Sequence, residues 1–209
     1  MLEFDHVIVA VRDLAAAAER FHAQYGLASL PGGRHTGLGT GNRIVPLGAA
    51  YVELMAVVDE EEAAASALAA WVGRMTEAGD RLAAVCLRTN DIEGAADRLD
   101  TTPIPMQRAQ PDGVVLTWRL AGLADTLEDP SLPFFIQWDD VPIDQLPGNS
   151  EAPHLIEPLG IDWVEIAQDP QKIHQRTGAD HLNIRIADGT PGLRAVGIAT
   201  TDGVVTITG

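Results

Sequence analysis

The chain has 209 residues, of which 46% are hydrophobic and 21% are charged. This composition is ordinary for one large or two small globular domains and excludes disorder, collagen and coiled coil. With 14 Lys and Arg against 30 Asp and Glu, the formal net charge is −16. A surface of that sign repels phosphate backbones and anionic headgroups, so we expect no nucleic-acid partner and no membrane partner.

Two further features concern the compartment in which the protein works. Cys86 is the sole cysteine, so no intrachain disulfide forms and the fold rests on its core. The sequence begins with acidic residues and no basic segment leads into an apolar stretch, as a secretory signal would require. No apolar run reaches the roughly 18 residues that cross a bilayer. The expected location is the cytoplasm.

The chain contains an internal repeat. Residues 13–21 align without a gap on residues 91–99 and share the pattern D-[LI]-x-x-A-A-[DE]-R-[FL]. In each copy the Asp can cap a helix that carries apolar and small residues at spacings of three and four. An apolar, β-branched strand is predicted before each helix, at 7–11 and 82–87. Both copies therefore begin with a strand, a tight turn and a helix.

Three strands are expected after each repeated helix. In the first copy, a glycine-rich loop with a short edge strand covers 32–41, and a hairpin follows at 42–47 and 51–57. The second copy offers strands at 114–120 and 134–138, separated by a longer loop. Each copy is thus predicted to be a β-α-β-β-β unit.

The remaining segments connect or extend these two units. An acidic run at 59–62 precedes an alanine-rich helix, and acids suit the positive end of a helix dipole better than a binding tail. After a linker, a partial third unit is predicted with strands at 161–167, 181–186, 193–200 and 204–207 and a helix from Pro170 to about Thr177. The expected organisation is a single domain made of five parts: a first module (1–58), a connecting helix (59–79), a second module (80–140), a linker (141–160) and a partial third module (161–209).

The paired units resemble a known superfamily. Asp5-His6-Val7 opens the first strand and Tyr51-Val52-Glu53-Leu54 lies in the last strand of the first unit, as in the vicinal oxygen chelate proteins. Residues 32–48 and 133–139 look like its glyoxalase-like domain branch. The resemblance implies an α+β fold in which each unit forms half of a barrel and the two halves enclose a cavity.

The resemblance also implies a metal site, with one His or Gln from the first strand and one Glu from the last strand of each unit. His6 and Glu53 match these positions in the first unit. In the second unit Ala84 stands where the first-strand ligand belongs, and Gln137 aligns with Glu53. The set is therefore reduced to His6, Glu53 and Gln137, for a divalent ion such as Zn, Ni, Mn or Fe. The alternative is a metal-free cavity, in which Glu53 has a partner such as an Arg.

Alternation along the last strands predicts the cavity walls. Tyr51, Glu53 and Met55 share one face, and Phe135, Gln137 and Asp139 share a face of the matching strand. Trp118 and Trp138 are candidates for an aromatic wall, and Arg43 or Arg119 could anchor a carboxylate or pair with Glu53. The expected ligand-binding residues are His35, Asn42, Arg43, Tyr51, Trp118, Arg119, Phe135, Gln137 and Trp138.

Two functions remain open from the sequence. The first is a lyase, isomerase or dioxygenase-type enzyme that acts on an oxygenated small molecule, with Glu53 as base or metal ligand and His6 as ligand or polarising group. The second is a metal-free protein that binds and sequesters its ligand, as the antibiotic-resistance members of the superfamily do. A structural partner that uses the acidic surface is a weaker third reading. The expected state is a monomer or a homodimer.

Overall fold

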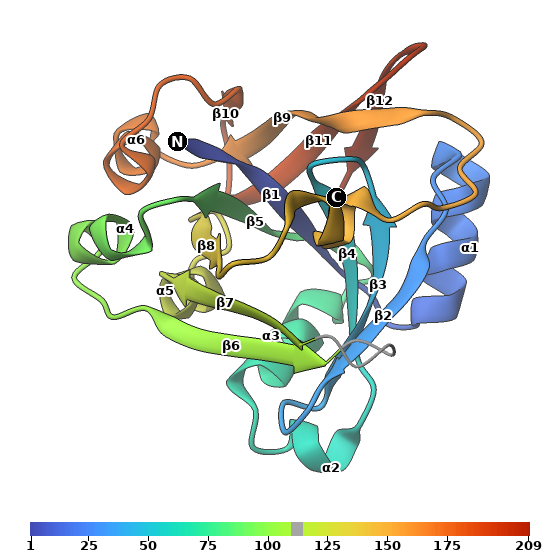
Figure 1. Cartoon of the computed structure of the whole chain (residues 1–209), viewed down its shortest axis with the longest axis horizontal. Helices are drawn as coiled ribbons and strands as arrows, with labels where there is room; N and C mark the ends of the chain where they lie inside the picture. The colour runs from blue at the N-terminus through green and yellow to red at the C-terminus, as the bar shows by residue number, and fades with distance from the viewer. Residues whose placement is uncertain (110–114) are drawn as a thin grey trace.

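A computed structural model of the chain describes residues 1–109 and 115–209 and shows two β-sheets with helices around them (Figure 1). The strands are β1 (Leu2–Ala10), β2 (Leu30–His35), β3 (Thr40–Pro46), β4 (Tyr51–Val57), β5 (Arg81–Thr89), β6 (Ile104–Ala109), β7 (Val115–Ala121), β8 (Phe134–Trp138), β9 (Pro158–Ala167), β10 (Ile184–Ala187), β11 (Gly192–Thr200) and β12 (Gly203–Thr208). The helices are α1 (Leu14–Tyr25), α2 (Glu60–Ala63), α3 (Ala67–Thr76), α4 (Ile92–Arg98), α5 (Leu123–Glu128) and α6 (Pro170–Thr177), with short 3-10 turns η1 (Ile143–Gln145) and η2 (Pro147–Asn149).

The two predicted β-α-β-β-β units form one eight-stranded sheet in the order β2-β3-β4-β1-β5-β8-β7-β6. In each unit the first strand pairs in parallel with the last, as β1 with β4 and β5 with β8. The two first strands pair antiparallel at the centre of the sheet. The strand order is therefore the same when followed outward from the centre in either direction, and the predicted fold of two half-barrels is confirmed.

The repeated helices begin as the shared motif predicts. The side chain of Asp13 accepts a hydrogen bond from the Ala16 N–H, and that of Asp91 accepts one from the Gly94 N–H. These caps satisfy backbone donors that have no partner within the helix. Helix α1 ends at Gly26, whose φ of 70° lies in the left-handed region that glycine adopts without strain.

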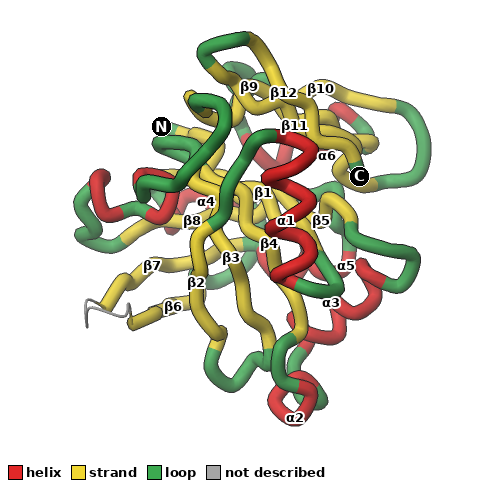
Figure 2. Tube along the Cα trace, turned by 90° about the vertical axis from the view of Figure 1, so that its right-hand side faces the viewer, coloured by secondary structure: helices red, strands yellow, loops and turns green. Residues whose placement is uncertain are grey.

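Side chains alternate between the two faces of the eight-stranded sheet, and each face is covered by a separate hydrophobic core. On the convex face, one core packs the sheet against α1, α4 and the second sheet, and its buried residues include Val7, Val52, Val85, Phe135 and Val196. On the concave face, a second core joins the sheet to α3 and includes Ile8, Met55, Trp71, Ala84, Cys86, Phe134 and Ile136. Figure 2 shows the second sheet at one end of the molecule and α2 at the other.

The sheet curls until its two edge strands, β2 and β6, approach each other (Figure 1). At this seam the Arg108 side chain on β6 lies against Gly33 on β2, where an added Cβ would stand 3.0 Å from Arg108 Cδ. The concave face is consequently almost enclosed.

Two connections differ from the prediction. The helix expected over 59–79 is two helices, since the Ser66 side chain caps a new start at α3. The acidic run is a helix start as expected: Asp59 caps α2, while Glu62 accepts hydrogen bonds from the N–H groups of Gly37 and Gly39. The loop expected before the last strand of the second unit contains α5. Of the strand predicted at 114–120, Val114 lies outside the described residues.

The third unit also runs β-α-β-β-β, but its strands form a separate sheet in the order β10-β9-β11-β12. Helix α6 starts at Pro170 behind the cap Asp169, as predicted. Buried Arg176 on α6 donates hydrogen bonds to the carbonyl oxygens of Gly122 and Pro133, which ties this unit to the second module. Among the described residues, the helices are too short or too polar to span a membrane.

Candidate active-site pocket

The concave face encloses a cavity of about 230 Å³ to which both modules contribute. The second module supplies Met106, Arg108, Trp118, Leu120, Leu123, Phe134, Ile136 and Trp138. The first module supplies His6, Ile8, His35, Leu38, Asn42, Ile44, Tyr51, Glu53 and Met55, and the connections add Leu68 from α3 and Pro147 from η2. Most of these side chains are apolar, and the polar ones lie mainly on the first module, with Arg108 on the second.

Glu53 stands at the centre of this polar group. Glu53 is buried, with 6% of its surface exposed. His6 Nε2 lies 3.7 Å from Glu53 Oε2, and His35 Nε2 lies 3.8 Å from Glu53 Oε1. The Asn42 amide donates a hydrogen bond to Oε1, while its own oxygen accepts one of 2.7 Å from the Gly33 N–H. The Gly33 bond fixes which side of the amide faces Glu53, so the carboxylate always meets a donor there.

Asp5 orients the His6 ring. The two residues are neighbours on β1, where a register shift between Phe4 and His6 marks a β-bulge that lets both side chains turn toward each other. Asp5 Oδ1 accepts the His6 Nδ1–H at 2.7 Å, so Nε2 is left to face Glu53. Asp5 is 2% exposed and also lies 3.7 Å from the Arg88 guanidinium.

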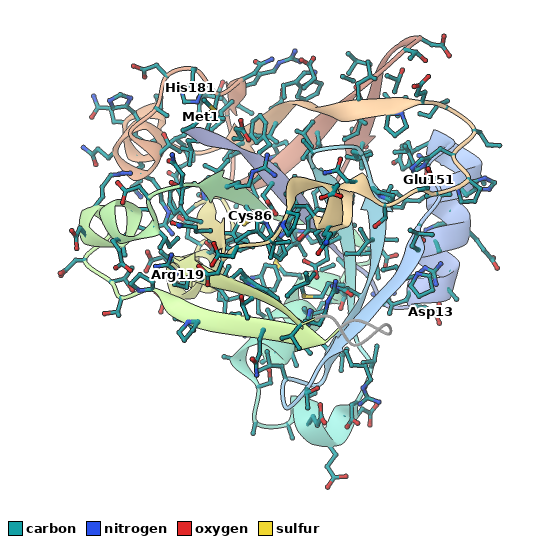
Figure 3. All side chains as sticks on the ribbon, viewed as in Figure 1. Met1, Asp13, Cys86, Arg119, Glu151 and His181 are labelled. Carbon is teal, nitrogen blue, oxygen red and sulfur yellow. The ribbon has the colours of Figure 1, made fainter. Side chains whose placement is uncertain are left out.

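Tyr51 stacks on His6, with ring centroids 4.6 Å apart. Burial raises the pKa of the Tyr51 phenol well above its usual value, the charges of Asp5 and Glu53 raise it further, and Arg108 opposes them. Tyr51 is therefore protonated at neutral pH and available as a donor. The same burial and the same two carboxylates raise the pKa of the Cys86 thiol, which Figure 3 places near the centre of the molecule.

Trp118 and Trp138 form the expected aromatic wall, with ring centroids 5.2 Å apart. The structure thus brings eight of the predicted residues to the pocket: His6, His35, Asn42, Tyr51, Glu53, Met55, Trp118 and Trp138. The predicted Arg partner of Glu53 is wrong, because two imidazoles and an amide surround the carboxylate instead.

The predicted face of β8 is also wrong. Phe134, Ile136 and Trp138 line the pocket, and the alternate side chains point to the convex side. Phe135 is buried in the convex core. Gln137 Oε1 accepts the Ile92 N–H at the start of α4 at 2.9 Å, and it is therefore not a metal ligand in this pocket.

Arg43 and Arg119 do not reach the pocket either. The Arg43 guanidinium donates to the hydroxyl and carbonyl oxygens of Ser29. Arg119 pairs with Asp139 and Glu93, each at 3.0 Å, on the face of β7 opposite Trp118. The arginine that lines the pocket is Arg108, which the prediction missed, as it missed Asp5.

The residues present fit the superfamily's four-ligand metal site poorly. On the same concave face, β5 beside β1 offers Ala84 and Cys86, and β8 offers Phe134 and Ile136. None of these four side chains carries a nitrogen or oxygen donor. The two modules therefore do not supply the four ligands of the superfamily's metal site.

A different group of three, Asp5, His6 and Cys86, has ligand atoms within 4.8 Å of one another, close enough to share an ion. Asp5 and His6 Nδ1 are already bonded to each other. Cys86 is buried with a raised thiol pKa, so an ion at this place would have to displace both the thiol proton and the Asp5–His6 hydrogen bond. This group too is a poor match for a resident ion.

The chain is thus a protein of the class in which two paired β-α-β-β-β modules enclose one pocket. A family model described as glyoxalase-like domain matches residues 4–182. The chain therefore belongs to the glyoxalase-like domain family of the vicinal oxygen chelate superfamily, as the sequence resemblance indicated. A comparison with curated proteins gave no match.

One solved structure supports the fold, and two others are reported beside it. A hypothetical protein from Staphylococcus aureus is 20% identical with a TM-score of 0.71, over 94% of this chain and 90% of that one. Methylmalonyl-CoA epimerase from Mycobacterium tuberculosis is 21% identical with a TM-score of 0.45, over 67% of this chain and 89% of that one. A Streptomyces coelicolor methylmalonyl-CoA epimerase variant in complex with 2-nitronate-propionyl-CoA is 20% identical with a TM-score of 0.45, over 65% and 96%.

Proposed function

We propose that this protein is an enzyme that moves a proton on an oxygenated small molecule, as a lyase or isomerase does, with Glu53 as the general base. One observation carries the proposal: a buried carboxylate stands between two imidazoles at the polar end of a mainly apolar pocket. A general base must lie within reach of the bound substrate and be oriented by its neighbours. Glu53 meets both conditions.

The neighbouring side chains divide the work. Glu53 takes a proton from a carbon next to a carbonyl group, and the protonated Tyr51 donates a hydrogen bond to the substrate oxygen on which negative charge develops. His6, held by Asp5, stands beside Glu53 and can receive or return the proton. Return of the proton to another carbon is an isomerisation, and loss of a leaving group is a lyase reaction.

The walls assist by excluding water. Met106, Leu120, Phe134 and Ile136 present hydrocarbon to the pocket, which strengthens the electrostatic interactions inside it. Because the two modules do not complete the four-ligand set, each step is assigned to this chain's own side chains.

The second candidate is a sequestering protein. It is favoured by the apolar contribution of the second module, since such a surface binds a ligand without acting on it. The two candidates make opposite predictions about chemistry and the same prediction about binding, so both quantities have to be measured.

Proton exchange separates them. The purified protein is incubated in D₂O with a panel of small 2-oxo acids and 2-hydroxy carbonyl compounds, and replacement of C–H by C–D is followed by NMR. We expect exchange by the wild type and a loss of at least about 100-fold in Glu53→Gln, while quenching of tryptophan fluorescence shows that the variant still binds. Exchange is expected to survive dialysis against a chelator.

The matched control is Glu93→Gln, which removes an exposed carboxylate on α4 outside the pocket. It should leave exchange unchanged. Binding without exchange in the wild type would establish the sequestering function instead. Equal exchange by wild type and Glu53→Gln would show that Glu53 is not the general base.

A further inference from the structure

We propose that the ligand of this pocket is a monocarboxylate with a flat apolar body, and that Arg108 binds its carboxylate. This inference rests on the proposed function and names the substrate class of the same site. The carboxylate is assigned to Arg108 because Arg108 is the one Lys or Arg among the described residues that line the pocket.

Arg108 has no carboxylate partner among residues 1–109 and 115–209. Five other arginines do, since ion pairs with Asp or Glu hold Arg20, Arg34, Arg88, Arg119 and Arg176. Arg43 and Arg185 also lack such a pair, but Ser29 oxygens hold the first and the Trp163 ring contacts the second. Because no described carboxylate pairs with it, the half-buried Arg108 guanidinium that faces the pocket is in a position to bind an anion there.

The backbone around Arg108 makes room for this role. Its side chain crosses the seam between the edge strands, where Gly33 on β2 has no Cβ; one placed there would stand 3.0 Å from Arg108 Cδ and 3.6 Å from Nη1. The Arg108 charge acts on the Tyr51 hydroxyl, and Tyr51 stacks on His6 beside Glu53. An anion at Arg108 therefore occupies the same pocket as the carbon presented to Glu53.

The lining sets the rest of the ligand. The paired indoles of Trp118 and Trp138 suit a flat body, and a cavity of about 230 Å³ suits a small molecule. A second negative charge on the ligand would approach Glu53 and Asp5, which are both buried carboxylates. Like charges in such surroundings repel strongly, so a monocarboxylate is favoured over a dicarboxylate or a phosphate ester.

A pair of probes that differ in charge but hardly in shape tests this proposal. 3-Phenylpropionate and 3-phenylpropionamide are titrated into the protein by calorimetry. We expect the wild type to bind the acid at least about tenfold more tightly than the amide. Arg108→Gln should lower the affinity for the acid to that for the amide and leave the affinity for the amide unchanged.

Two further variants sharpen the result. Arg119→Gln makes the same change on the outer face of β7 and should keep the wild-type preference. Arg108→Lys keeps the charge without the bidentate geometry and should keep part of the preference. Thermal melting verifies that each variant is folded, and the comparison of the two probes on the wild type needs no variant.

Equal binding of acid and amide by the wild type, binding of neither, or an unchanged preference in Arg108→Gln would overturn the proposal. These outcomes leave the exchange experiment at Glu53 standing. Conversely, failure of that exchange experiment leaves a preference for the acid intact, so the two proposals fail separately.

Discussion

The indole Nε1 of Trp138 donates a hydrogen bond of 3.0 Å to Oδ2 of Asp5. This bond joins β8, the last strand of the second module, to β1, the first strand of the first. The other Asp5 oxygen accepts from His6. The orientation of the imidazole beside Glu53 thus depends on a contact between modules.

Asp5 and Trp138 should therefore be energetically coupled. Asp5→Asn is expected to lower the free energy of unfolding by about 1–3 kcal/mol, because it weakens two bonds of a buried carboxylate. In a double-mutant cycle with Trp138→Phe, measured by urea unfolding, we expect a coupling of at least about 0.5 kcal/mol. Trp163→Phe in the second sheet is the control and should add to Asp5→Asn without coupling. Additivity in both cycles would contradict the proposed link.

The turn that carries Leu38 depends on Gly39. Gly37 and Gly39 both have left-handed φ values, of 76° and 67°. An added Cβ meets nothing within 4 Å at Gly37, but at Gly39 it would stand 2.3 Å from the backbone nitrogen of Ala63. Gly37→Ala should cost about 1–2 kcal/mol of unfolding free energy from the backbone conformation alone. Gly39→Ala should cost clearly more in the same urea titration, and equal losses would argue against the close approach of α2.

Arg176 is expected to hold the third unit in place. It donates hydrogen bonds of 2.7 and 2.8 Å to the carbonyl oxygens of Pro133 and Gly122 and pairs with Asp125 at 2.6 Å. Arg176→Met should lower the free energy of unfolding by about 3 kcal/mol, since it leaves buried acceptors unpaired. Arg176→Lys should recover only part, because one ammonium group cannot match the guanidinium fork. Exposed Arg74→Met is the control, expected within about 0.5 kcal/mol of wild type.

His154 should make stability sensitive to acid. Burial lowers the pKa of His154 below its usual 6.5; a hydrogen bond with the Pro46 backbone opposes this shift in part, and nearby His22 adds to it. Its neutral ring accepts the Ala28 N–H at 3.0 Å. Above pH 6.5 the ring is neutral in both states and the full stability is present. As the pH falls, the unfolded chain takes up the proton first, so stability declines from about pH 6.5 down to the lower pKa of the folded state.

The variant His154→Gln keeps an acceptor for the Ala28 N–H but does not titrate. We expect its unfolding free energy to fall less than that of wild type between pH 7 and pH 5, as measured by urea titration at each pH. His174→Gln, at an exposed position, is the matched control and should retain the wild-type decline. The same decline in His154→Gln would show that other groups cause it.

Much of the first module is predictable to the level of its side chains, because local rules decide it, and Asp5 and Arg43 are the exceptions. Asp13 caps its helix, Gly26 ends it, and alternation on β4 turns Tyr51 and Glu53 to the concave face. These features depend on neighbours within a few residues. The polar end of the pocket follows from them.

The second module shows where such rules fail. Strand register pairs Ile8 with Glu53 and Cys86 with Phe134. The repeat aligns Ile8 with Cys86, so the residue of β8 that corresponds to Glu53 is Phe134. The sequence alignment matches Glu53 with Gln137, which lies an odd number of residues further along the strand. Such a displacement turns every side chain to the opposite face. Helix α5 alters the spacing before β8, and nothing in the aligned motif reveals it.

Asp5 and Arg108 were missed for a different reason. A bulge in β1 turns Asp5 toward His6, and the closure of the sheet brings Arg108 to Gly33. Both depend on pairing between strands distant in sequence, which a pattern along one strand does not record. Asp5 would otherwise be assigned to the face opposite His6.

The two modules line the pocket with different side chains, so the two ends of the pocket are chemically different. A duplicated scaffold with equivalent halves would accept a molecule either way round. Here one half supplies Glu53, His6 and Tyr51, while the other supplies mainly hydrocarbon and indole. A molecule with dissimilar ends therefore has one preferred orientation, and the two enantiomers of a chiral ligand present different substituents to Glu53.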